Sequence, residues 1–568
     1  MSRCDLVLLH APSVYDFREK TILYGPVSDQ IPSSPVFEMY PIGFTSLAEY
    51  LERAGYRVRI VNLAVRMLSD RNFDAEKMIA RLNAPIFGID LHWMVHCHGA
   101  IEVARLVKKH HPEANVLFGG FSSSYWYRQL MEYPEIDFIL RGDSTEEPLR
   151  QLMDCLRRKQ GPESVPNLVW RDSQGVVQEN PLSHVPTDIS HIMQSHYANT
   201  IRSVIRYRDL ASYTPFKGWK DYPISAVFIC RGCTQNCTIC GGSSAAFRDS
   251  FHRPRPVFRS PEAVVRDITQ IARFSNGPAF ILGDLRQAGE DYADELFRLL
   301  QENPVKNQLI FELFNPAPKE FLQQMGRSAP DFCLEMSPES HDPEVRKAEG
   351  RHFSTEAMEQ TFRDALGAGC GRLDVFFMIG LARQTPQSAL DTVEYCGRLL
   401  DRFDGDKRLF LFIAPLAPFL DPGSLAFENP EKHGYRVLFK TVEEHRQALV
   451  LPSWKYSLNY ETEWMSREQI VETTYEAMIR LNTIKTEYGV ITPETARAEN
   501  QRLEAGRDMT HTIDELAARG NYETLRNLKA QIDRINMSAH THWEELKLPV
   551  GATRVRFLRS VWSWATGR

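Results

Sequence analysis

Three cysteines in the middle of the chain stand at a spacing that suits an iron–sulfur cluster. Cys233, Cys237 and Cys240 form a C-x3-C-x2-C run that directly follows the strand-like stretch 225–232. Three thiolates this close can hold three irons of a [4Fe–4S] cluster, and no fourth ligand stands at a fixed spacing from them. The fourth iron is then open to a small molecule, so the run predicts a cluster that takes part in chemistry.

A fourth thiol just before the run leaves a second interpretation open. With Cys230 the pattern reads C-x2-C-x3-C-x2-C, which could hold zinc through four thiolates. Structural zinc sites usually join two ligand pairs across a longer loop, and the sequence has no second C-x2-C or histidine pair. Cys230 also falls within the apolar run, where a strand would bury it as a small hydrophobe. We therefore favour the cluster over zinc.

The three-cysteine spacing resembles the cluster motif of the radical S-adenosylmethionine (SAM) enzymes. The resemblance implies that the open iron chelates the amino and carboxylate groups of SAM. It also implies that the reduced cluster cleaves SAM to methionine and a 5′-deoxyadenosyl radical. The family usually has an aromatic residue before the third cysteine, whereas this chain has Ile239, which still offers its backbone and an apolar face to adenine.

The composition is that of an ordinary globular protein of a reducing compartment. The 568 residues are 43% apolar and 25% charged, enough for about three domains. A net charge of −6 argues against nucleic acid as the main partner. Ten cysteines, four of them within eleven residues, do not resemble a disulfide framework. With neither a signal peptide nor an apolar run long enough for a transmembrane segment, we expect a cytoplasmic protein.

Residues 1–158 alternate apolar, strand-like runs with helical stretches. This pattern predicts an α/β domain with a doubly wound parallel sheet of the flavodoxin or Rossmann type. Ligands of such sheets bind beyond the carboxyl ends of the strands. The predicted strands are 5–10, 57–63, 85–91, 115–119 and 137–140.

This domain resembles the cobalamin-binding domain that precedes the radical SAM domain in a large subclass. Members commonly show a strand ending in Gly-Gly and a later strand end reading Gly-Glu-x-Glu, and here the corresponding stretches are 119–120 and 142–147. A flavodoxin-like domain with no cofactor in these loops is the alternative. The resemblance implies cobalamin contacts from Ser13, His92, Trp93, His96, Gly119, Gly120, Ser122, Ser123, Gly142, Asp143 and Glu146.

The Asp-x-His-x-x-Gly motif, which supplies a histidine to cobalt in many other cobalamin proteins, is absent, as is usual for this subclass. Three histidines nonetheless follow the third predicted strand, at positions 92, 96 and 98. If a side chain faces cobalt, we expect it to be His92, Trp93 or His96. The alternative, which we favour, is that these histidines cap or pack against the next helix.

From residue 222 to 435, after a connector over 159–221, the alternation of strands and helices resumes. Six strand–helix units resemble the partial (βα)6, TIM-like barrel of radical SAM enzymes, with active residues at the carboxyl ends of the strands. The runs Ser260-Pro261 and Thr385-Pro386 mark helix starts, with an N-cap followed by proline. The predicted strands are 226–231, 279–283, 308–314, 331–335, 373–381 and 408–414.

The barrel resemblance implies SAM contacts at these strand ends. Asp284 stands where the family carries the acid that holds the SAM amino group, and Glu335 lies in a stretch similar to the one that contacts ribose and carboxylate. Arg383 could pair with the SAM carboxylate at the rim. For each acid, an ordinary helix cap is the alternative. The implied contacts are Ile239, Gly283, Asp284, Glu335, Ser337, Gly380 and Arg383.

Residues 436–568 read as a mainly helical domain. Ser466 and Gln469 form a capping-box pattern ahead of an amphipathic run. The aromatic stretch 454–464 could line a substrate pocket or simply pack. Basic and aromatic residues alternate between 554 and 564, so weak membrane contact is conceivable there, although a docked terminal helix or strand is favoured.

Taken together, the chain is identified as a cobalamin-binding radical SAM enzyme, most simply a methyltransferase. The resemblance implies that one SAM methylates cobalamin and that a second SAM yields the 5′-deoxyadenosyl radical. This radical removes a hydrogen from an unactivated carbon, which then takes the methyl group from methylcobalamin. One alternative is a rearrangement, cyclisation or carbon–carbon coupling with the same cofactors, and another is a redox- or cobalamin-sensing regulator. We expect a small-molecule or lipid-like substrate and an electron donor of the flavodoxin or ferredoxin type.

Overall fold

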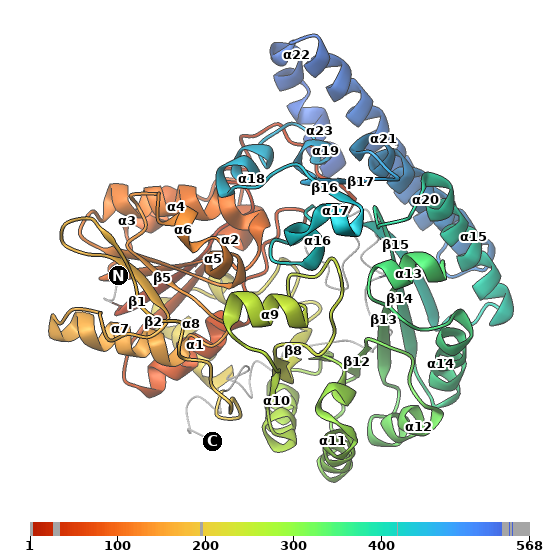
Figure 1. Cartoon of the computed structure of the whole chain (residues 1–568), viewed down its shortest axis with the longest axis horizontal. Helices are drawn as coiled ribbons and strands as arrows, with labels where there is room; N and C mark the ends of the chain where they lie inside the picture. Colours follow the sequence, from red (N-terminus) through yellow and green to blue (C-terminus); the bar gives the residue numbers. More distant parts are fainter. Residues whose placement is uncertain are drawn as a thin grey trace.

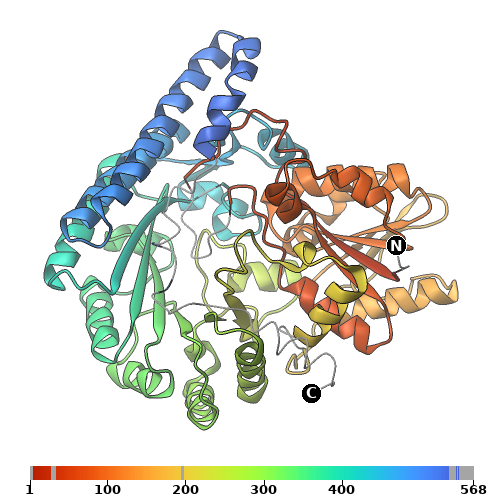
Figure 2. The same ribbon diagram turned by 180° about the vertical axis from the view of Figure 1, so that it is seen from behind.

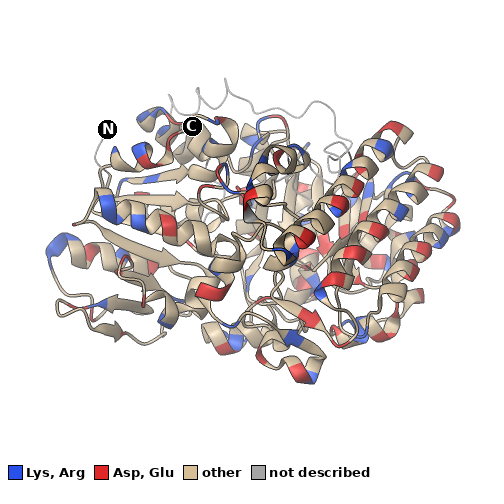
Figure 3. Cartoon of the chain, turned by 90° about the horizontal axis from the view of Figure 1, so that it is seen from above, with Lys and Arg blue, Asp and Glu red and all other residues tan. Residues whose placement is uncertain are grey.

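Two parallel α/β sheets form the two halves of the molecule. The computed structural model describes residues 4–26, 34–192, 197–416, 418–536, 545 and 548. In Figure 1 the N-terminal sheet lies at the left, the second sheet at the lower right, and the long C-terminal helices at the upper right. Lys and Arg are interspersed with Asp and Glu along the described helices (Figure 3).

The N-terminal sheet has the strand order β2-β1-β3-β4-β5-β6-β7, and its first five strands are parallel. Helices cover both faces, so strands β1 to β3 are fully buried and consist largely of apolar residues. The strand order reverses between β1 and β3, which is where ligands of such sheets bind. The predicted doubly wound sheet is confirmed, with strands β1 Leu6–His10, β2 Val58–Asn62, β3 Ile86–Asp90, β4 Asn115–Gly119 and β5 Phe138–Leu140.

The helices of this half separate into two layers. Helices α1 and α7 pack on one face of the sheet, and α3 and α4 pack on the other. The short helix η1 and helix α5 follow the carboxyl ends of β3 and β4. The bounds are α1 Gly43–Arg53, α2 Leu63–Ser69, α3 Ala75–Ala80, η1 Met94–His96, α4 Cys97–His110, α5 Phe121–Tyr125, α6 Tyr127–Leu130 and α7 Glu146–Arg158.

The sheet continues past residue 158, into the segment that the sequence suggested was a connector. Strands β6 Leu168–Arg171 and β7 Val177–Glu179 add antiparallel to β5. The short strand β7 faces solvent at both ends, so it lacks the apolar run that marked the other strands. Helix α8 Tyr197–Tyr207 then leads to the second half.

The second half is a six-stranded, all-parallel sheet in the order β15-β14-β13-β12-β11-β8. Helices α10, α11, α12, α14 and α15 pack on its outer face, so the predicted partial (βα)6 barrel is confirmed. The bounds are β8 Ser225–Phe228, α10 Pro261–Phe274, β11 Ala279–Leu282, α11 Glu290–Glu302, β12 Leu309–Leu313, α12 Lys319–Ser328, β13 Cys333–Glu339, α14 Thr355–Gly367, β14 Arg372–Ile379, α15 Pro386–Arg402 and β15 Leu409–Pro415.

The local signals for these elements hold, with one break and one extension. The predicted strand 226–231 divides into β8 and, outside the barrel sheet, β9 Cys230–Arg231. The Ser260 and Thr385 side chains accept hydrogen bonds from the backbone N–H groups of residues 263 and 388, as the predicted N-caps should. Strand β13 runs four residues beyond its predicted end, through a register shift between Met336 and Glu339. Pro338 lies in that shift, where the missing N–H of proline is tolerated.

The C-terminal helices pack along the barrel. Helix α20 Arg467–Glu487 lies against α15 and α21 Pro493–Ala518, and the predicted capping box of Ser466 and Gln469 closes its start. The aromatic stretch 454–464 forms α19 Trp454–Ser457 and β17 Tyr460–Thr462, and β17 pairs with β16 Tyr435–Val437. The basic and aromatic stretch 554–564 lies outside the described residues. None of the helices in the described part combines the length and apolar character needed to cross a membrane.

The segment after β1 reaches across to the C-terminal part, as Figure 2 shows from behind. The Leu23 N–H donates to the carbonyl of Pro452 at 2.9 Å, and the Trp454 N–H donates back to the carbonyl of Leu23 at 2.9 Å. This exchange fixes the loop that leaves the β1 end. It therefore joins the edge of the N-terminal sheet to the mouth of the barrel.

The loop after β1 also depends on a close approach to helix α4. A Cβ at Gly99 would lie 1.8 Å from the Pro12 carbonyl oxygen, whereas a Cβ at Gly367, in helix α14, would meet no atom within 4 Å. We predict that Gly99→Ala lowers the free energy of unfolding by about 1–3 kcal/mol through overpacking. Gly367→Ala should change it by no more than about 1 kcal/mol, in the stabilising direction. Urea denaturation of both variants tests this, and equal effects would contradict the close approach.

Candidate active site between the two sheets

The three cysteines of the motif lie in the loop that leaves the first barrel strand. They follow the short strand β9 Cys230–Arg231, and all three are free, half-buried thiols. Burial raises the pKa of Cys233 to about 11 and also raises the pKa of Cys237 and Cys240. Backbone N–H groups already point at two sulfurs, from Gln235 to Cys233 Sγ and from Gly242 to Cys240 Sγ, each at 3.3 Å. A bound cation would displace the thiol protons, so the loop fits a thiolate-held metal cluster.

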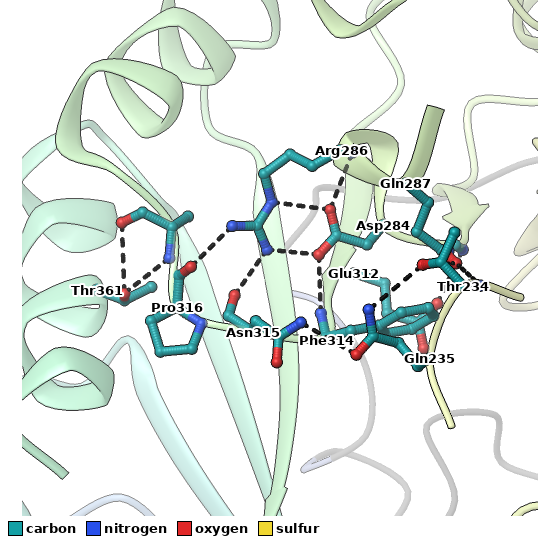
Figure 4. Close-up of polar contacts among 12 residues, drawn as sticks. Thr234, Gln235, Asp284, Arg286, Gln287, Glu312, Phe314, Asn315, Pro316 and Thr361 are labelled. Carbon is teal, nitrogen blue, oxygen red and sulfur yellow. Dashed lines mark hydrogen bonds and ion pairs between the residues drawn. The ribbon is translucent and has the colours of Figure 1, made fainter. Parts of the chain in front are cut away.

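Neighbouring strand ends hold this cysteine loop in place. Gln287, after β11, accepts hydrogen bonds through Oε1 from the Thr234 N–H at 2.9 Å and from the Cys233 thiol at 3.4 Å. Asn315, after β12, donates to Gln235 Oε1 at 3.2 Å. Figure 4 shows both contacts to the loop residues 234 and 235. The loop is thereby positioned by the barrel and not only by its own sequence.

The fourth thiol lies in a short strand outside the barrel sheet and is half-buried, whereas the sequence predicted that the barrel strand 226–231 would bury it. Cys230 belongs to β9, which pairs with β10 Val257–Phe258, opposite Phe258. Its Sγ is 3.5 Å from the carbonyl oxygen of Gly232. Burial raises the pKa of Cys230 to about 12. Nothing in this placement requires Cys230 as a ligand.

The predicted SAM-anchoring acid, Asp284, already has strong partners. Its Oδ1 accepts from Arg286 Nε at 2.9 Å, and its Oδ2 accepts from the Phe314 N–H at 3.0 Å. Arg286 also donates to the carbonyls of Asn315 and Pro316 (Figure 4). Asp284 thus links the ends of β11 and β12, and its role as a SAM contact stays a prediction.

A second acid at the same place was not predicted from the sequence. Glu312, on β12, accepts through Oε2 from the N–H of Gly283 at 2.8 Å. Burial raises the pKa of Glu312 to about 7, and the nearby Asp284 charge adds to the rise. A glutamate within the otherwise apolar strand Leu309–Leu313 was the signal that could have revealed it. A carboxyl near neutrality in the barrel interior is a candidate ligand-binding group.

Further carboxylates line the barrel interior on the next strands. Glu335 is in register with Glu312 on one side and with Asp374 on the other. Asp374 pairs with Arg372 at 2.8 Å, and Glu335 is buried. Ser337, in the same strand, is partly exposed. The register of Glu335 places it on the interior wall, whereas Ser337 lies in the register shift between Met336 and Glu339, and the roles of both as SAM contacts stay predictions.

An arginine that the sequence reasoning missed stands beside the cysteine loop. Arg351 donates to Glu339 Oε1 at 2.8 Å and to the Phe314 carbonyl at 2.9 Å. Its positive charge opposes the rise in the pKa of Cys237 that burial causes. The carbonyl oxygens of Ala348 and Glu349, just before it, accept from Thr238 at 2.9 and 3.2 Å. A buried cation here favours the anionic state of a thiolate cluster.

The remaining predicted SAM contacts lie around the mouth. Ile239 is buried beside the third cysteine. Gly380 has a φ of +94°, and a Cβ there would lie 2.3 Å from the Tyr460 hydroxyl, so only glycine fits. Arg383 is exposed at the rim and lies 3.3 Å from Glu344. The structure brings Ile239, Gly283 and Asp284 to the cysteine loop side, whereas Arg383 faces solvent.

Histidines gather at the switch point of the N-terminal sheet. Asp90, at the end of β3, accepts from His10 Nδ1 at 2.9 Å through one oxygen and from His92 Nδ1 at 2.7 Å through the other. Burial opposes ionisation of Asp90, but the two imidazoles hold its pKa well below the usual range. The His96 ring lies between them, with centroids 4.8 Å from His10 and 5.0 Å from His92. Burial and these two rings hold the pKa of His96 well below its usual range, so His96 is neutral.

The glycine and serine contacts predicted for cobalamin surround this group. A Cβ at Gly120 would lie 2.7 Å from the His92 Cα, whereas a Cβ at Gly119 would meet nothing within 4 Å. Ser122 and Ser123 are buried, and Ser123 donates to the Gly119 carbonyl at 3.2 Å. The Ser13 hydroxyl is buried and has no hydrogen-bond partner among the described residues. Open space at Gly119 and an unused hydroxyl at Ser13 fit a large polar cofactor.

The acids predicted at the end of β5 bind the other half of the molecule. Asp143 pairs with Arg253 at 3.0 Å, and both side chains are buried. Glu146 pairs with Arg231, two residues before the first motif cysteine, at 3.0 Å. Gly142, beside them, has a φ of +101° and donates to the Ser124 hydroxyl. Their role toward cobalamin stays a prediction, while their ion pairs join the two sheets.

A second contact connects the histidine group to the cysteine loop. Trp93 Nε1 donates to Asp421 Oδ1 at 3.4 Å, and Asp421 Oδ2 accepts from the Gly241 N–H at 3.1 Å. Gly241 directly follows Cys240. The carboxyl ends of the two sheets therefore face each other, with the cysteine loop on one side and the histidines on the other.

Two family models match this chain. The B12 binding domain matches residues 33–150, and the radical SAM superfamily matches residues 227–396. The chain is 25% identical over 277 residues to the hopanoid C-3 methylase of Methylococcus capsulatus, which covers 48% of this chain and 47% of that protein. It is 23% identical over 299 residues to the cytidylyl-2-hydroxyethylphosphonate methyltransferase of Streptomyces wedmorensis, covering 46% and 54%. The chain spans about half the length of the curated relatives it matches.

The fold is also similar to a solved structure. The radical SAM methyltransferase TsrM from Kitasatospora setae, with cobalamin and a [4Fe–4S] cluster bound, superimposes with a TM-score of 0.56 at 13% identity. The match covers 89% of this chain and 100% of that chain. It includes both sheets, so the order of the two halves is shared.

The assignment of three cysteines as cluster ligands predicts that their variants bind much less iron than a variant of the neighbouring Cys230. After anaerobic reconstitution, the native chain should hold about four irons, and Cys233→Ala, Cys237→Ala and Cys240→Ala should each lose most of them. Cys230→Ala, three residues before the motif's first cysteine, is the matched control and should keep full iron and sulfide. Iron and acid-labile sulfide analysis tests this. Equal loss in Cys230→Ala, or tightly bound zinc in the native chain, would favour the four-thiolate zinc interpretation.

The raised pKa of Glu312 predicts a pH-dependent stability. Its pKa rises from 4.5 to about 7 on folding, so the folded chain prefers the neutral carboxyl. This contribution is present below pH 4.5 and is lost as the pH rises through about 7. Glu312→Gln, which cannot ionise, should therefore stabilise the cofactor-free chain by about 1–3 kcal/mol at pH 8 and by little at pH 5.

Denaturation at both pH values measures the Glu312 effect, with the exposed Glu320→Gln as control. The control should show no such pH dependence. A Glu312→Gln variant that is less stable than the native chain at pH 8 would mean that the ionised carboxylate is well solvated or paired.

Proposed function

Because this chain belongs to the cobalamin-dependent radical SAM enzymes, with a [4Fe–4S] cluster, SAM and cobalamin as cofactors, we propose that it methylates an unactivated carbon. These cofactors supply the hydrogen-abstracting radical and the methyl group. The chain's own residues must hold both reagents against one substrate and exclude water.

One observation carries this proposal, the opposed placement of the two cofactor regions. The contacts from Trp93 through Asp421 to Gly241 span from the histidine group to the cysteine loop. Abstracting a hydrogen and delivering a methyl group to the same carbon requires both reagents within reach of one substrate position. A sensor whose cluster only reports has no need for this alignment.

The residues divide the positioning between them. Cys233, Cys237 and Cys240 would hold the cluster, and the nearby Arg351 would offset its negative charge. Asp284 and Glu312 place carboxylates beside Gly283, where the ammonium of an amino acid group would be bound. Glu312 can change its proton near neutral pH, so it adapts to a cationic ligand.

An apolar pocket supports a substrate of low polarity. It lies between the segment after β1 and the C-terminal part, with Ile22, Phe37, Leu449, Leu451 and Trp454 in its wall. The Phe37 ring packs edge-on against Trp93 at 5.0 Å, so the pocket adjoins the histidine group. A small, largely apolar or lipid-like molecule matches this lining.

The names of two of the curated relatives favour methylation, whereas a third relative, 21% identical over 290 residues, is named as an anaerobic magnesium-protoporphyrin IX monomethyl ester cyclase. Both curated relatives described above are named as a methylase or methyltransferase, although the chain covers only half of each. Their substrates differ, a hopanoid in one and a cytidylyl phosphonate in the other. These names therefore support methylation as the reaction type. They do not identify the substrate, which we infer from the lining of the pocket instead.

Product analysis tests the proposed reaction. Reconstituted enzyme with cobalamin, a low-potential reductant and methyl-deuterated SAM should form 5′-deoxyadenosine and S-adenosylhomocysteine in equal amounts, and a panel of apolar small molecules should reveal a deuteromethylated product. Cys237→Ala should lose the 5′-deoxyadenosine. Formation of 5′-deoxyadenosine with an altered but unmethylated product would favour the rearrangement or coupling alternative. Cobalamin binding with no cleavage of SAM under any condition would favour the regulator.

A further inference from the structure

The most unusual group outside the cysteine loop is a carboxylate shared by two imidazoles. Asp90 is buried at the end of β3, and each of its oxygens accepts from a different histidine, His10 at 2.9 Å and His92 at 2.7 Å. Such a shared carboxylate fixes the tautomer and direction of each ring. The two hydrogen bonds offset the cost of burying the carboxylate.

His92 has the geometry of a metal ligand. Its Nδ1 is bound to Asp90, so its other nitrogen, Nε2, carries the lone pair and points away from the carboxylate. Histidines that ligate metals almost always donate their other ring N–H to a carboxylate or carbonyl in this way. No hydrogen bond occupies His92 Nε2 within the part of the chain that the structure describes.

The other three histidines are committed elsewhere. His10 uses both nitrogens, Nδ1 on Asp90 and Nε2 on the Phe37 carbonyl at 3.2 Å. His96 donates through Nδ1 to the Ala11 carbonyl at 3.1 Å and is only 1% exposed. His98 accepts from the Tyr15 N–H at 3.2 Å. His92, at 30% side-chain exposure, is the accessible member of the group.

The position of His92 matches the place where the cofactor must lie. It follows β3 directly, beside β1, and this pair of strands is the switch point of the sheet. The Gly120 backbone packs against the His92 backbone, whereas a Cβ added at Gly119 would meet no atom within 4 Å. The neighbouring Trp93 contacts Asp421 of the barrel side, so His92 lies on the edge that faces the cysteine loop.

We propose that His92 ligates the cobalt of bound cobalamin through Nε2, with Asp90 as the carboxylate that orients the ring and with His10 as the second support of Asp90. The proposal rests on the cobalamin assignment and goes beyond it, because it replaces the favoured packing role of His92 and gives this chain a protein ligand where the expected motif is absent. Asp90 and His10 are positioning residues that act through His92.

Electron paramagnetic resonance of the bound cob(II)alamin tests the ligand without any variant. A nitrogen ligand splits each cobalt line into three when it is 14N and into two when it is 15N. Protein grown with 15N-labelled histidine and loaded with unlabelled cobalamin should show the two-line splitting. A three-line pattern in the labelled protein would assign the ligand to the cofactor's own base. Unsplit lines would leave cobalt without a nitrogen ligand, and either result overturns the proposal.

Variants then identify which histidine it is. His92→Ala should lose the splitting while still binding cobalamin, and His96→Gln and the surface variant His110→Ala should keep it. Asp90→Asn should keep the splitting and weaken cobalamin binding about tenfold, as loss of a supporting carboxylate does elsewhere. Splitting that persists in His92→Ala, or that disappears in His96→Gln alone, overturns the assignment to His92. If His92→Ala binds no cobalamin, the labelled native protein decides whether a histidine ligates cobalt, and splitting kept in His96→Gln and His110→Ala leaves His92 as the accessible histidine.

These outcomes separate the inference from the assignment on which it rests. A native chain that binds no cobalamin contradicts the assignment of cobalamin as the cofactor, and with it the assignment of His92 as the cobalt ligand. A native chain that binds cobalamin stoichiometrically, without the labelled splitting, contradicts the ligand and leaves the cofactor in place.

Discussion

Two ion pairs between the sheets, one buried and one partly buried, are the constraint on which the site depends. Arg253 with Asp143, and Arg231 with Glu146, each join a loop of the barrel to the carboxyl edge of the N-terminal sheet. Removing one partner from a buried pair leaves an uncompensated charge and typically costs about 3–5 kcal/mol. Because Arg231 lies two residues before the first motif cysteine, its pairing also fixes where the cluster loop stands relative to the histidine group.

The carboxyl groups in the interior of the barrel lower the stability of the fold. Desolvation raises the pKa values of the partly exposed Glu312 and the fully buried Glu349 to about 7, and Asp374 is buried against Arg372. Apolar side chains of similar size would pack there at less cost. Polar groups kept in an interior at such a cost are typical of sites that bind a charged ligand. The surrounding helices and the apolar faces of the strands supply the stability that this site does not.

Most of the fold could be predicted, because its signals are local. Apolar runs of strand length, Ser-Pro and Thr-Pro helix starts and the capping box at Ser466 depend on neighbours within a few residues. The signals failed where a segment lacked such a pattern. Strand β7 is too exposed to show an apolar run, and β13 continues through Pro338 only because a register shift accommodates it.

The sequence by itself determined the chemistry that the chain could attempt: three thiols at cluster spacing after a strand, a Gly-Gly strand end in a doubly wound domain, and six strand–helix units behind the cysteines. Only the tertiary structure decided the partners of the charged groups. His10 and Asp90 are eighty residues apart, and Asp143 and Arg253 are separated by 110. Asp284, predicted from its motif, is held by Arg286 and Phe314, while Glu312 lies beside Gly283. Spacing along the chain cannot report these pairings, because side chains far apart in sequence meet only when the carboxyl ends of parallel strands converge.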